Sequence, residues 1–514
     1  MELHFRWIHV ILAFLVVFLF MLIKKGRGSK TQNRNSKLPP GPWKLPLIGN
    51  LHNMSGLLPH HTLRDLAKKY GPLMHLQLGE VSAVVVSSPK VAEQFLKTHD
   101  LIFASRPQIL STEIMSYGYS DILFSPYGNY WRQLRKIVTL ELLSTKHVQS
   151  FRSIREEEVS NLIQTISSMA GSSINLTERI FSLTTDITCR AAFGKKCKDK
   201  EAFTSSMQEV VKLSGGFEVC DLFPSLKILH VIGGMKRKLE RIHGKVGRVL
   251  NNIIDDHRAN RSSTMIKTTL DNILELEEDL VDVLIRIQKK GELEFPITTD
   301  NIKSVISDIF TAGTETSSTT LEWAMSEILK NPRVMVKVQA EVRRVFNGKR
   351  SIDETDIHKL DYLKLIIKET LRLHPPAPLL PRECRETCEI HGFEIPMKTK
   401  LIVNAWAIGR DQEYWSDADS FKPERFNGCS LDYKGTNFEY IPFGAGRRMC
   451  PGVSFGIANI ELPLAHLLYH FDWKLANGLK PEDLDMSESF GATVRRRTDL
   501  NLIPIPYYNQ ASTT

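Results

Sequence analysis

Hydrophobic residues follow three patterns along the chain, and each pattern predicts a different kind of element. The first is an almost continuous apolar run at residues 7–23, WIHVILAFLVVFLFMLI. As a helix this run would be about 25 Å long, just enough to cross a bilayer. The second is a helical period that recurs at 62–70, 89–98, 302–324, 332–346 and 453–471. The third is a set of β-like runs at 73–88, 388–407 and 499–505. These patterns predict a mainly α-helical body with small antiparallel sheets.

Only basic charges follow the apolar run, at Lys24, Lys25, Arg27, Lys30, Arg34 and Lys37. The positive-inside rule places this flank in the cytosol. A cleaved signal peptide would carry its charge before the run and a small-residue cleavage site after it, so we expect a retained signal-anchor. Proline cannot continue a membrane helix, and Pro39, Pro40 and Pro42 follow. The predicted organisation is a lumenal end at 1–6, an anchor at 7–23, a basic and proline-rich hinge at 24–42 and a cytosolic domain at 43–514.

Composition narrows the possible function classes without choosing among them. The chain has 514 residues, of which 42% are hydrophobic and 24% charged, and a globular protein of this size can enclose a cofactor. Its net charge of +9 does not argue for nucleic acid and suits anionic lipid or an acidic partner. The cysteine count, seven, is odd and low, and no pair of C-x-x-C units is present. A disulfide scaffold and a structural zinc site are therefore disfavoured.

The segment 443–452, FGAGRRMCPG, surrounds one cysteine with glycines. Gly444 and Gly446 permit positive φ and let the backbone approach a large flat ligand closely. Phe443 can form an aromatic wall, Arg448 offers a fixed cation for a carboxylate, and backbone N–H groups can stabilise the thiolate of Cys450. A tight turn around a buried structural cysteine is the competing interpretation.

The apolar helix predicted at 302–324 contains an unusual polar stretch, Ala312–Gly313–Thr314–Glu315–Thr316. Glycine inside a helix costs about 1 kcal/mol relative to alanine. The Thr316 hydroxyl can donate to the carbonyl of Ala312 and bend the helix. Such a bulge offers a polar pocket for O₂ and water, whereas a packing glycine and a back-bonded threonine explain it equally well.

Two further pairs are spaced so that their members share one helix face. Glu369 and Arg372 are three residues apart and can form an ion pair, which on a surface would contribute under about 1 kcal/mol. Trp131 and Arg135 are four apart and would most often form a cation–π pair. Neither pair indicates a function by itself.

Taken together, these stretches resemble the cytochrome P450 superfamily, and they occur in its order along the chain. The segment 443–452 matches the family's haem-binding loop, F-G-x-G-x-R-x-C-x-G, at every fixed position. The resemblance implies a single large haem domain in which Cys450 is the axial ligand of the iron of haem b. It implies a buried structural network of Glu369, Arg372 and Arg425. The other residues that it places around haem are Phe443, Gly444, Gly446, Arg448, Trp131, Arg135, Arg382, Ala312 and Gly313.

The resemblance also implies a reaction, the insertion of one oxygen atom from O₂ into a substrate C–H bond. Thr316 would organise proton delivery, and Glu315 would belong to the proton relay. Electrons would come from NADPH through NADPH–cytochrome P450 reductase, with cytochrome b5 as an optional second donor. Basic residues on the cysteine side, such as Arg132 and Lys136, would suit an acidic reductase, although a solvated helix face explains them equally well.

Within the superfamily the chain looks like a plant microsomal enzyme of the 71 clan, close to its D-type members. This implies a single-pass protein of the endoplasmic reticulum membrane and a small hydrophobic substrate, with a sesquiterpene or diterpene favoured. No nucleic-acid partner is expected. The residues expected to line the substrate pocket are Ile306, Ile309, Phe310, Ala377, Leu379 and Phe490.

Three alternatives stay open at this point. An alkaloid or phenolic could be oxidised by the same chemistry. A reductase-independent haem-thiolate isomerase or dehydratase would use a pre-oxidised substrate, but such enzymes tend to lose the threonine that stands here as Thr316. A membrane-held haem sensor or carrier would need the thiolate but not Glu315 and Thr316.

Overall fold

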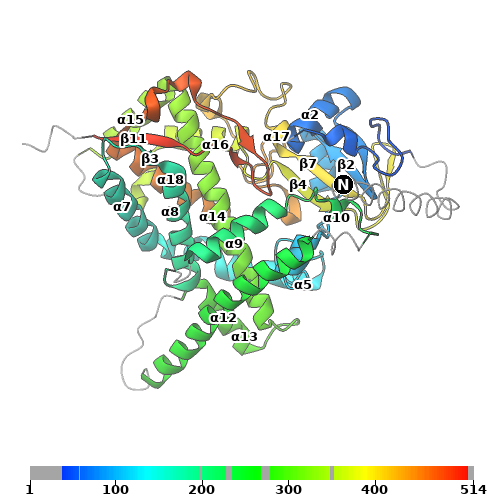
Figure 1. Ribbon diagram of the computed structural model, residues 1–514, viewed down its shortest axis with the longest axis horizontal. Coiled ribbons are helices and arrows are strands. Elements are labelled where there is room, and N and C mark those ends of the chain that lie inside the picture. The colour runs from blue at the N-terminus through cyan, green and yellow to red at the C-terminus, as the bar shows by residue number, and fades with distance from the viewer. Residues whose placement is uncertain are drawn as a thin grey trace, which may run out of the picture.

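A computed structural model describes residues 37–56, 58–196, 200–226, 234–267, 278–347 and 352–507. The predicted anchor at 7–23 and its basic flank up to residue 36 lie outside the described residues. Among the residues that are described, no helix is both long and apolar enough to span a membrane. Figure 1 shows a helix-rich body with one group of strands on its right and another on its left, which agrees with the mainly α fold expected from the sequence.

The largest sheet has the order β1-β2-β7-β4 and is formed by β1 (Leu73–Leu78), β2 (Val81–Val86), β7 (Lys400–Asn404) and β4 (Leu379–Glu383). Strand β2 pairs with β7 in parallel, and the other neighbours are antiparallel. The valine-rich β2 is almost fully buried, as expected of a strand covered on both faces. The small sheets comprise β3 (Ile174–Asn175), β11 (Asn501–Pro506) and β8 (Phe471–Leu475); β5 (Cys388–Ile390) and β6 (Phe393–Ile395); and β9 (Glu488–Ser489) and β10 (Arg495–Arg496).

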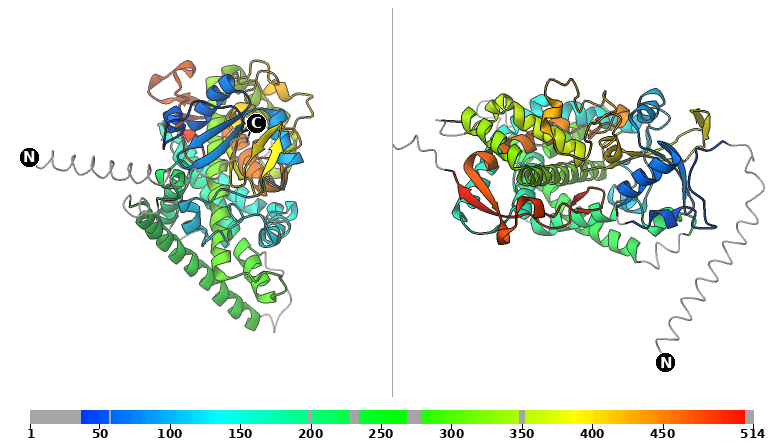
Figure 2. Two further views of the ribbon diagram at one scale, coloured as in Figure 1. Left: turned by 90° about the vertical axis from the view of Figure 1, so that its right-hand side faces the viewer. Right: turned by 90° about the horizontal axis from the view of Figure 1, so that it is seen from above.

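Helix α14 (Thr299–Lys330) runs through the body and positions the site (Figures 1 and 2). It begins with a capping box in which Thr298 and Asn301 exchange side-chain and backbone hydrogen bonds. Its apolar residues pack mainly against α8 (Leu176–Phe193), α18 (Val453–His470) and α16 (Asp361–Leu373). Most residues of α14 are buried. An exposed residue in the middle of this helix therefore lies on a face that the other described elements do not cover.

The remaining helices cover this core. Those before α14 are η1 (Leu51–Met54), α2 (Pro59–Tyr70), α3 (Pro89–Glu93), η2 (Gln94–Thr98), α4 (Leu110–Met115), α5 (Asn129–Ile137), η3 (Val138–Leu142), α6 (Thr145–Ser150), α7 (Arg152–Ser168), α9 (Lys200–Leu213), α10 (Val219–Leu222), α12 (Met235–Lys267) and α13 (Leu280–Lys290). Those after it are α15 (Pro332–Val345), η4 (Glu354–Lys359), α17 (Ala405–Ile408), η5 (Pro423–Phe426), η6 (Gly446–Arg448), η7 (Ala476–Gly478) and η8 (Pro481–Asp483).

The β-like run predicted at 388–407 ends earlier than expected. Residues 405–407 belong to the short helix α17 and not to strand β7. The cause is local, since the side-chain oxygen of Asn404 accepts a hydrogen bond from the Ala407 amide at 3.0 Å and starts the helix.

Candidate functional site

The loop around Cys450 is shaped by its glycines. Gly444 and Gly446 have φ values of 73° and 68°, which favour glycine. A Cβ at Gly446 would also lie 2.6 Å from a carboxylate oxygen of Asp100, so no side chain fits there. The Cys450 amide donates to the Phe443 carbonyl at 3.0 Å, which closes the loop. The cysteine is thereby held at the start of α18.

The sulfur of Cys450 lies in an environment with opposing electrostatic effects. Burial raises the pKa of the thiol. The Gly452 amide, which donates to Sγ at 3.3 Å, and the positive charge of Arg135 both act to lower the pKa. The protein groups therefore offset only part of the cost of burying a negatively charged thiolate. A metal cation bound to the sulfur would offset the remainder.

Buried guanidinium groups gather next to this loop, and some of their donors have no partner. Arg382 is 1% exposed, and its Nη2 donates to the Ala445 carbonyl at 3.2 Å. Its Nε and Nη1, together with Nε of Arg106, have no hydrogen-bond partner among the described residues. Burial lowers the pKa of Arg382, and the charges of Arg106 and Arg448 lower it further. A cluster with spare donors and excess positive charge fits an anionic ligand such as a pair of carboxylates.

Arg448 is held differently from Arg382, because its donors are used within the protein. Its Nε donates to the Ala104 carbonyl at 2.6 Å and its Nη2 to the Ser125 carbonyl at 2.5 Å. Its guanidinium carbon lies 4.1 Å from the ring centre of Trp131. The cation over Trp131 is thus Arg448 and not Arg135, the partner expected from helical spacing.

Arg106 is a residue of this cluster that the sequence analysis missed. It precedes Pro107 in an irregular segment before α4 and belongs to none of the motifs quoted above. Burial lowers the pKa of Arg106 to about 10, while Asp121 acts in the opposite direction. Only the fold brings it to Arg382, so a sequence motif could not reveal it.

On α14, the predicted back-bond of Thr316 is confirmed. The Thr316 hydroxyl donates to the Ala312 carbonyl at 2.6 Å. Ala312 is exposed in the middle of this buried helix, and Asp308, Thr311 and Thr316 are partly exposed on the same face. We call these four residues the uncovered face of α14.

Two close approaches position this part of α14 against the helix that follows Cys450. A Cβ at Gly313 would lie 3.0 Å from the ring of Phe455, and a Cβ at Gly456 would lie 4.0 Å from the hydroxyl of Ser317. Phe455 and Gly456 both lie in the first turn of α18. The polar stretch of α14 and the cysteine loop are therefore neighbours, although they are far apart in sequence.

Glu315 is buried, although it lies four residues after Thr311 and seven after Asp308 and therefore on the same side of α14. It is 6% exposed, and one carboxylate oxygen accepts a hydrogen bond from the Thr493 hydroxyl at 3.2 Å. Burial raises the pKa of Glu315, while Arg495, Thr493 and Lys212 act to lower it. The side chain thus joins α14 to the C-terminal segment and is not hydrogen-bonded to Thr316.

The pair Glu369 and Arg372 is completely buried, with 0% side-chain exposure for both residues. Two guanidinium nitrogens of Arg372 donate to the two carboxylate oxygens of Glu369 at 2.8 Å each. Arg425 and the Lys422 amide donate to the same carboxylate, also at 2.8 Å. The network therefore fixes η5 and its surrounding loop against α16.

A family model described as cytochrome P450 matches residues 39–500. The chain belongs to the cytochrome P450 family. It is therefore a haem mono-oxygenase, and the alternative of a sensor or carrier is set aside. As a P450 it uses O₂, with electrons from NADPH delivered by a reductase.

Relatives of known activity extend over nearly the whole chain. Desmethyl-deoxy-podophyllotoxin synthase from Sinopodophyllum hexandrum is 62% identical, covering 96% of each chain. Premnaspirodiene oxygenase from Hyoscyamus muticus is 56% identical, covering 98% of this chain and 99% of its own. Cytochrome P450 71D7 from Solanum chacoense is 55% identical, covering 96% and 98%, which confirms the resemblance to D-type members of the plant 71 family.

A solved structure supports the fold alone. A zebra fish cytochrome P450 solved with abiraterone matches with a TM-score of 0.74 over 88% of this chain and 100% of its own. The identity is 24%, so this likeness confirms the P450 fold and carries no argument about the substrate.

The residues of this P450 fit the haem group of the family. Cys450 offers a sulfur ligand that needs a cation, and Arg382 and Arg106 offer unpaired donors for the two propionates. On the uncovered face of α14, Ala312 is exposed and offers a surface against which a flat ring can pack.

The residues expected to line the substrate pocket fall into two groups. Ile306, Ile309 and Phe310 are buried, with 1%, 7% and 1% exposure, and Phe310 packs on the rings of Phe193 and Phe203. They form the packed side of α14, because apolar residues bury against α8 and α9. They remain predicted substrate contacts, and the uncovered face adds the exposed Ala312 on the same helix.

The second group keeps partial exposure. Ala377, Leu379 and Phe490 are all half-buried. The Phe490 ring lies 6.0 Å from that of Phe217 and 6.1 Å from that of His60. These three residues remain predicted substrate contacts.

Proposed function

We propose that this P450 hydroxylates a small, mainly apolar terpenoid of sesquiterpene size. The observation that carries the proposal is the named activity of relatives that are similar over nearly the whole chain. Premnaspirodiene oxygenase is 56% identical, and 5-epiaristolochene 1,3-dihydroxylase and germacrene A hydroxylase are each 54% identical. The half-buried Ala377, Leu379 and Phe490 add apolar surface suited to a hydrocarbon skeleton held by shape.

A second candidate is the substrate of desmethyl-deoxy-podophyllotoxin synthase, which is 62% identical over 96% of each chain. This candidate differs from the first in the class of compound that is oxidised. Either substrate would lie beside the uncovered face of α14, where Ala312 is exposed.

The roles of the site residues follow from their contacts. Cys450 would bind the haem iron, and Arg382, Arg106, Arg448, Arg135 and Trp131 would surround the propionates. When bound, the haem supplies the activation of O₂ that is common to the family. Thr316 would hold a proton at its hydroxyl beside Ala312 and Gly313. Glu315 would act on this site indirectly, through the hydrogen bond that positions the segment around Thr493.

We further propose that residues 7–23 anchor the protein in the endoplasmic reticulum membrane and that 43–514 form the cytosolic domain. The reductase would dock on the side that carries Arg132 and Lys136, both exposed on α5. Reversal of both charges should lower the rate of reduction without changing the spectrum of the carbon-monoxide complex.

The test of the proposed function is a substrate panel in membranes that contain the enzyme and a plant reductase. The panel comprises premnaspirodiene, 5-epiaristolochene, germacrene A and the substrate of desmethyl-deoxy-podophyllotoxin synthase. NADPH-dependent hydroxylation of at least one terpene is expected. Activity on the last compound alone selects the second candidate, and turnover without NADPH would favour a haem-thiolate isomerase.

A further inference from the structure

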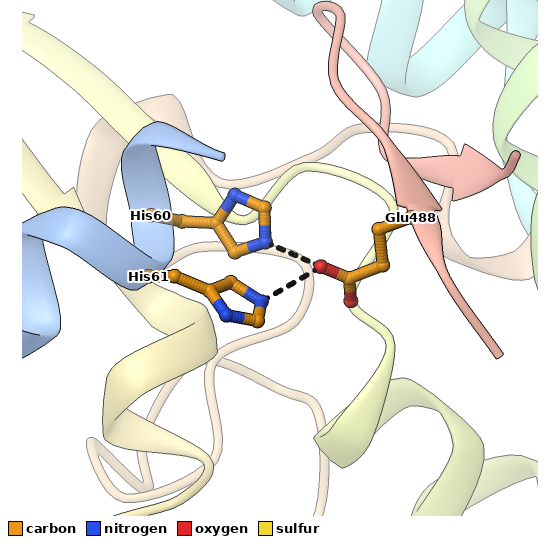
Figure 3. Close-up of side chains that lie close together, drawn as sticks. All are labelled: His60, His61 and Glu488. Carbon is orange, nitrogen blue, oxygen red and sulfur yellow. Dashed lines mark hydrogen bonds and ion pairs between the residues drawn. The ribbon is translucent and has the colours of Figure 1, made fainter. Parts of the chain in front are cut away.

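Two adjacent histidines near the start of the chain share one carboxylate near its end (Figure 3). His60 and His61 lie in the first turn of α2, and Glu488 lies in β9. Each imidazole Nε2 is 2.8 Å from the same oxygen, Oε2 of Glu488. The side chains of His60 and Glu488 are 0% and 8% exposed, while that of His61 is 36% exposed. We call these residues the His60–His61–Glu488 cluster.

The charges around the cluster indicate a carboxylate that accepts two N–H bonds. Both imidazoles hold the pKa of Glu488 well below its usual range, although burial acts to raise it. Burial lowers the pKa of His60, with Glu488 acting in the opposite direction. Arg410 and His374 also face the cluster. Hydrogen bonds to an ionised acceptor are roughly twice as strong as neutral ones, so the cluster joins α2 to β9 firmly.

The cluster is connected to the segment between β9 and β10, residues 490–494, which we call the tip segment. Phe490 stacks against His60, with ring centres 6.1 Å apart and planes inclined by 24°. At the other end, the Thr493 hydroxyl donates to Glu315 of α14 at 3.2 Å. A ladder of two residues per strand is too short to fix its own position. The tip segment therefore depends on contacts from outside the hairpin.

Neighbouring elements leave part of the tip segment uncovered. The Ala492 amide donates to the Val211 carbonyl of α9 at 3.1 Å, yet Ala492 itself is exposed. Trp323 of α14 donates through its indole nitrogen to the Val494 carbonyl at 3.2 Å. The segment thus extends from α2 to α14 beside the stretch that carries Glu315 and Thr316.

We propose that the His60–His61–Glu488 cluster is a positioning device that fixes the tip segment beside α14 and so selects ligands by size. The cluster touches no reacting atom in this proposal; it acts through Phe490 and the backbone of the tip segment. The inference deepens the proposed function, since it assumes that the substrate lies beside the uncovered face of α14. A preorganised wall binds a large ligand more tightly, because the wall need not be ordered on binding.

The same three atoms could also hold a divalent metal, since they all lie within 4.8 Å of one another. Two observations favour the metal-free arrangement. Tetrahedral zinc with bonds of about 2.0–2.1 Å separates its ligand atoms by roughly 3.3 Å, whereas both N–O distances here are 2.8 Å. The cation of Arg410 also faces the cluster and would oppose a second cation.

The experiment measures ligand binding to the full-length holoenzyme in lipid nanodiscs, using two azoles of different size. Imidazole is the small probe and clotrimazole the large one, both followed by the shift of the haem absorbance. Glu488→Gln and His61→Ala should weaken clotrimazole binding about tenfold, the effect of losing one charge-assisted hydrogen bond. Imidazole binding should be unchanged, because so small a ligand does not reach the tip segment.

The matched control is His257→Ala. The His257 imidazole is also buried, and its Nε2 lies 2.8 Å from a carboxylate oxygen of Asp279. This variant should leave both azoles unaffected. Equal weakening of both azoles, or of clotrimazole in the control, would overturn the proposal. If Glu488→Gln lacks the carbon-monoxide spectrum of a folded P450, the half-buried His61→Ala decides alone.

A zinc-binding assay distinguishes the positioning device from a metal site. Wild-type protein is incubated with zinc chloride, dialysed and assayed for bound zinc, with and without chelator. No stoichiometric zinc is expected. One equivalent that is lost in His61→Ala would replace the positioning device with a metal site. Because azole binding needs no turnover, a failed terpene panel would refute the proposed substrate and leave this test intact.

Discussion

Two regions of this P450 are held together in different ways. We call the region of the Cys450 loop and the Glu369–Arg372 pair the cysteine side, and the region around the uncovered face of α14 the substrate side. On the cysteine side, the Cys450 loop is closed by its own backbone, and Glu369 binds Arg372 only three residues away. On the substrate side, the ties that hold α14 to other segments join distant residues: Asp308 accepts from the amides of Ile122 and Leu123 at 3.0 and 3.1 Å, and Glu315 accepts from Thr493. Loss of Cys450 or of the Glu369–Arg372 pair should therefore destroy the enzyme, whereas changes on the substrate side should alter selection or coupling.

The largest expected effect tests the first half of that comparison at Cys450. Cys450→Ala should remove the thiolate-type carbon-monoxide spectrum and reduce oxidation of every substrate to background, because no other side chain in the loop can supply a thiolate. Spectra of purified protein and a reductase-coupled assay measure this. Retention of the same spectrum and turnover in the variant would refute the assignment of the haem ligand.

The next effect concerns folding. Glu369→Ala leaves the buried guanidinium of Arg372 without its carboxylate, which should cost about 3–5 kcal/mol and prevent recovery of folded holoenzyme. The control is Glu424→Ala, whose partners Arg333 and Lys337 are exposed and whose loss should cost under about 1 kcal/mol. Similar yields of the two variants would show that the buried network is dispensable.

A smaller effect is expected on the substrate side at Thr316. Thr316→Ala should leave haem incorporation intact and lower the product formed per NADPH by on the order of tenfold or more, because the hydroxyl beside Ala312 is lost. The control is Thr320→Ala, which removes a similar back-bond of 2.8 Å one turn further along α14, in a buried position. Simultaneous assay of NADPH and product decides the matter, and unchanged coupling in Thr316→Ala would contradict the role.

The smallest effect concerns the cluster of buried arginines that includes Arg382 and Arg106. Its sign is opposite in the haem-bound protein and in the apoprotein. Arg382→Met should speed haem loss to apomyoglobin about tenfold, since charge-assisted hydrogen bonds disappear. The same variant should stabilise the apoprotein against urea, because it removes buried donors that lack partners. Destabilisation of the apoprotein would mean that Arg382 is a structural residue and not a ligand contact.

The distance along the chain between two partners also explains what the sequence could reveal. The Cys450 loop, the Glu369–Arg372 pair and the Thr316 back-bond each involve residues within one short segment, so spacing alone predicted their contacts. Arg106 and Arg382 meet only through the fold, as do the partners of the His60–His61–Glu488 cluster, and no local pattern could indicate them. Phe310 was expected in the pocket because the family lines it with this part of the helix, but its packing on the rings of Phe193 and Phe203 depends on distant residues and could not be predicted from spacing.

The tie between α2 and β9 has a consequence for recombining this enzyme with its relatives. His60 and Glu488 are separated by 428 residues, so a crossover almost anywhere in the body separates them. A chimera that exchanges only the C-terminal segment would combine the tip segment of one enzyme with helix α2 of the other. Exchange of residues around His60 together with those around Glu488 should transfer product profile more faithfully than exchange of either segment alone.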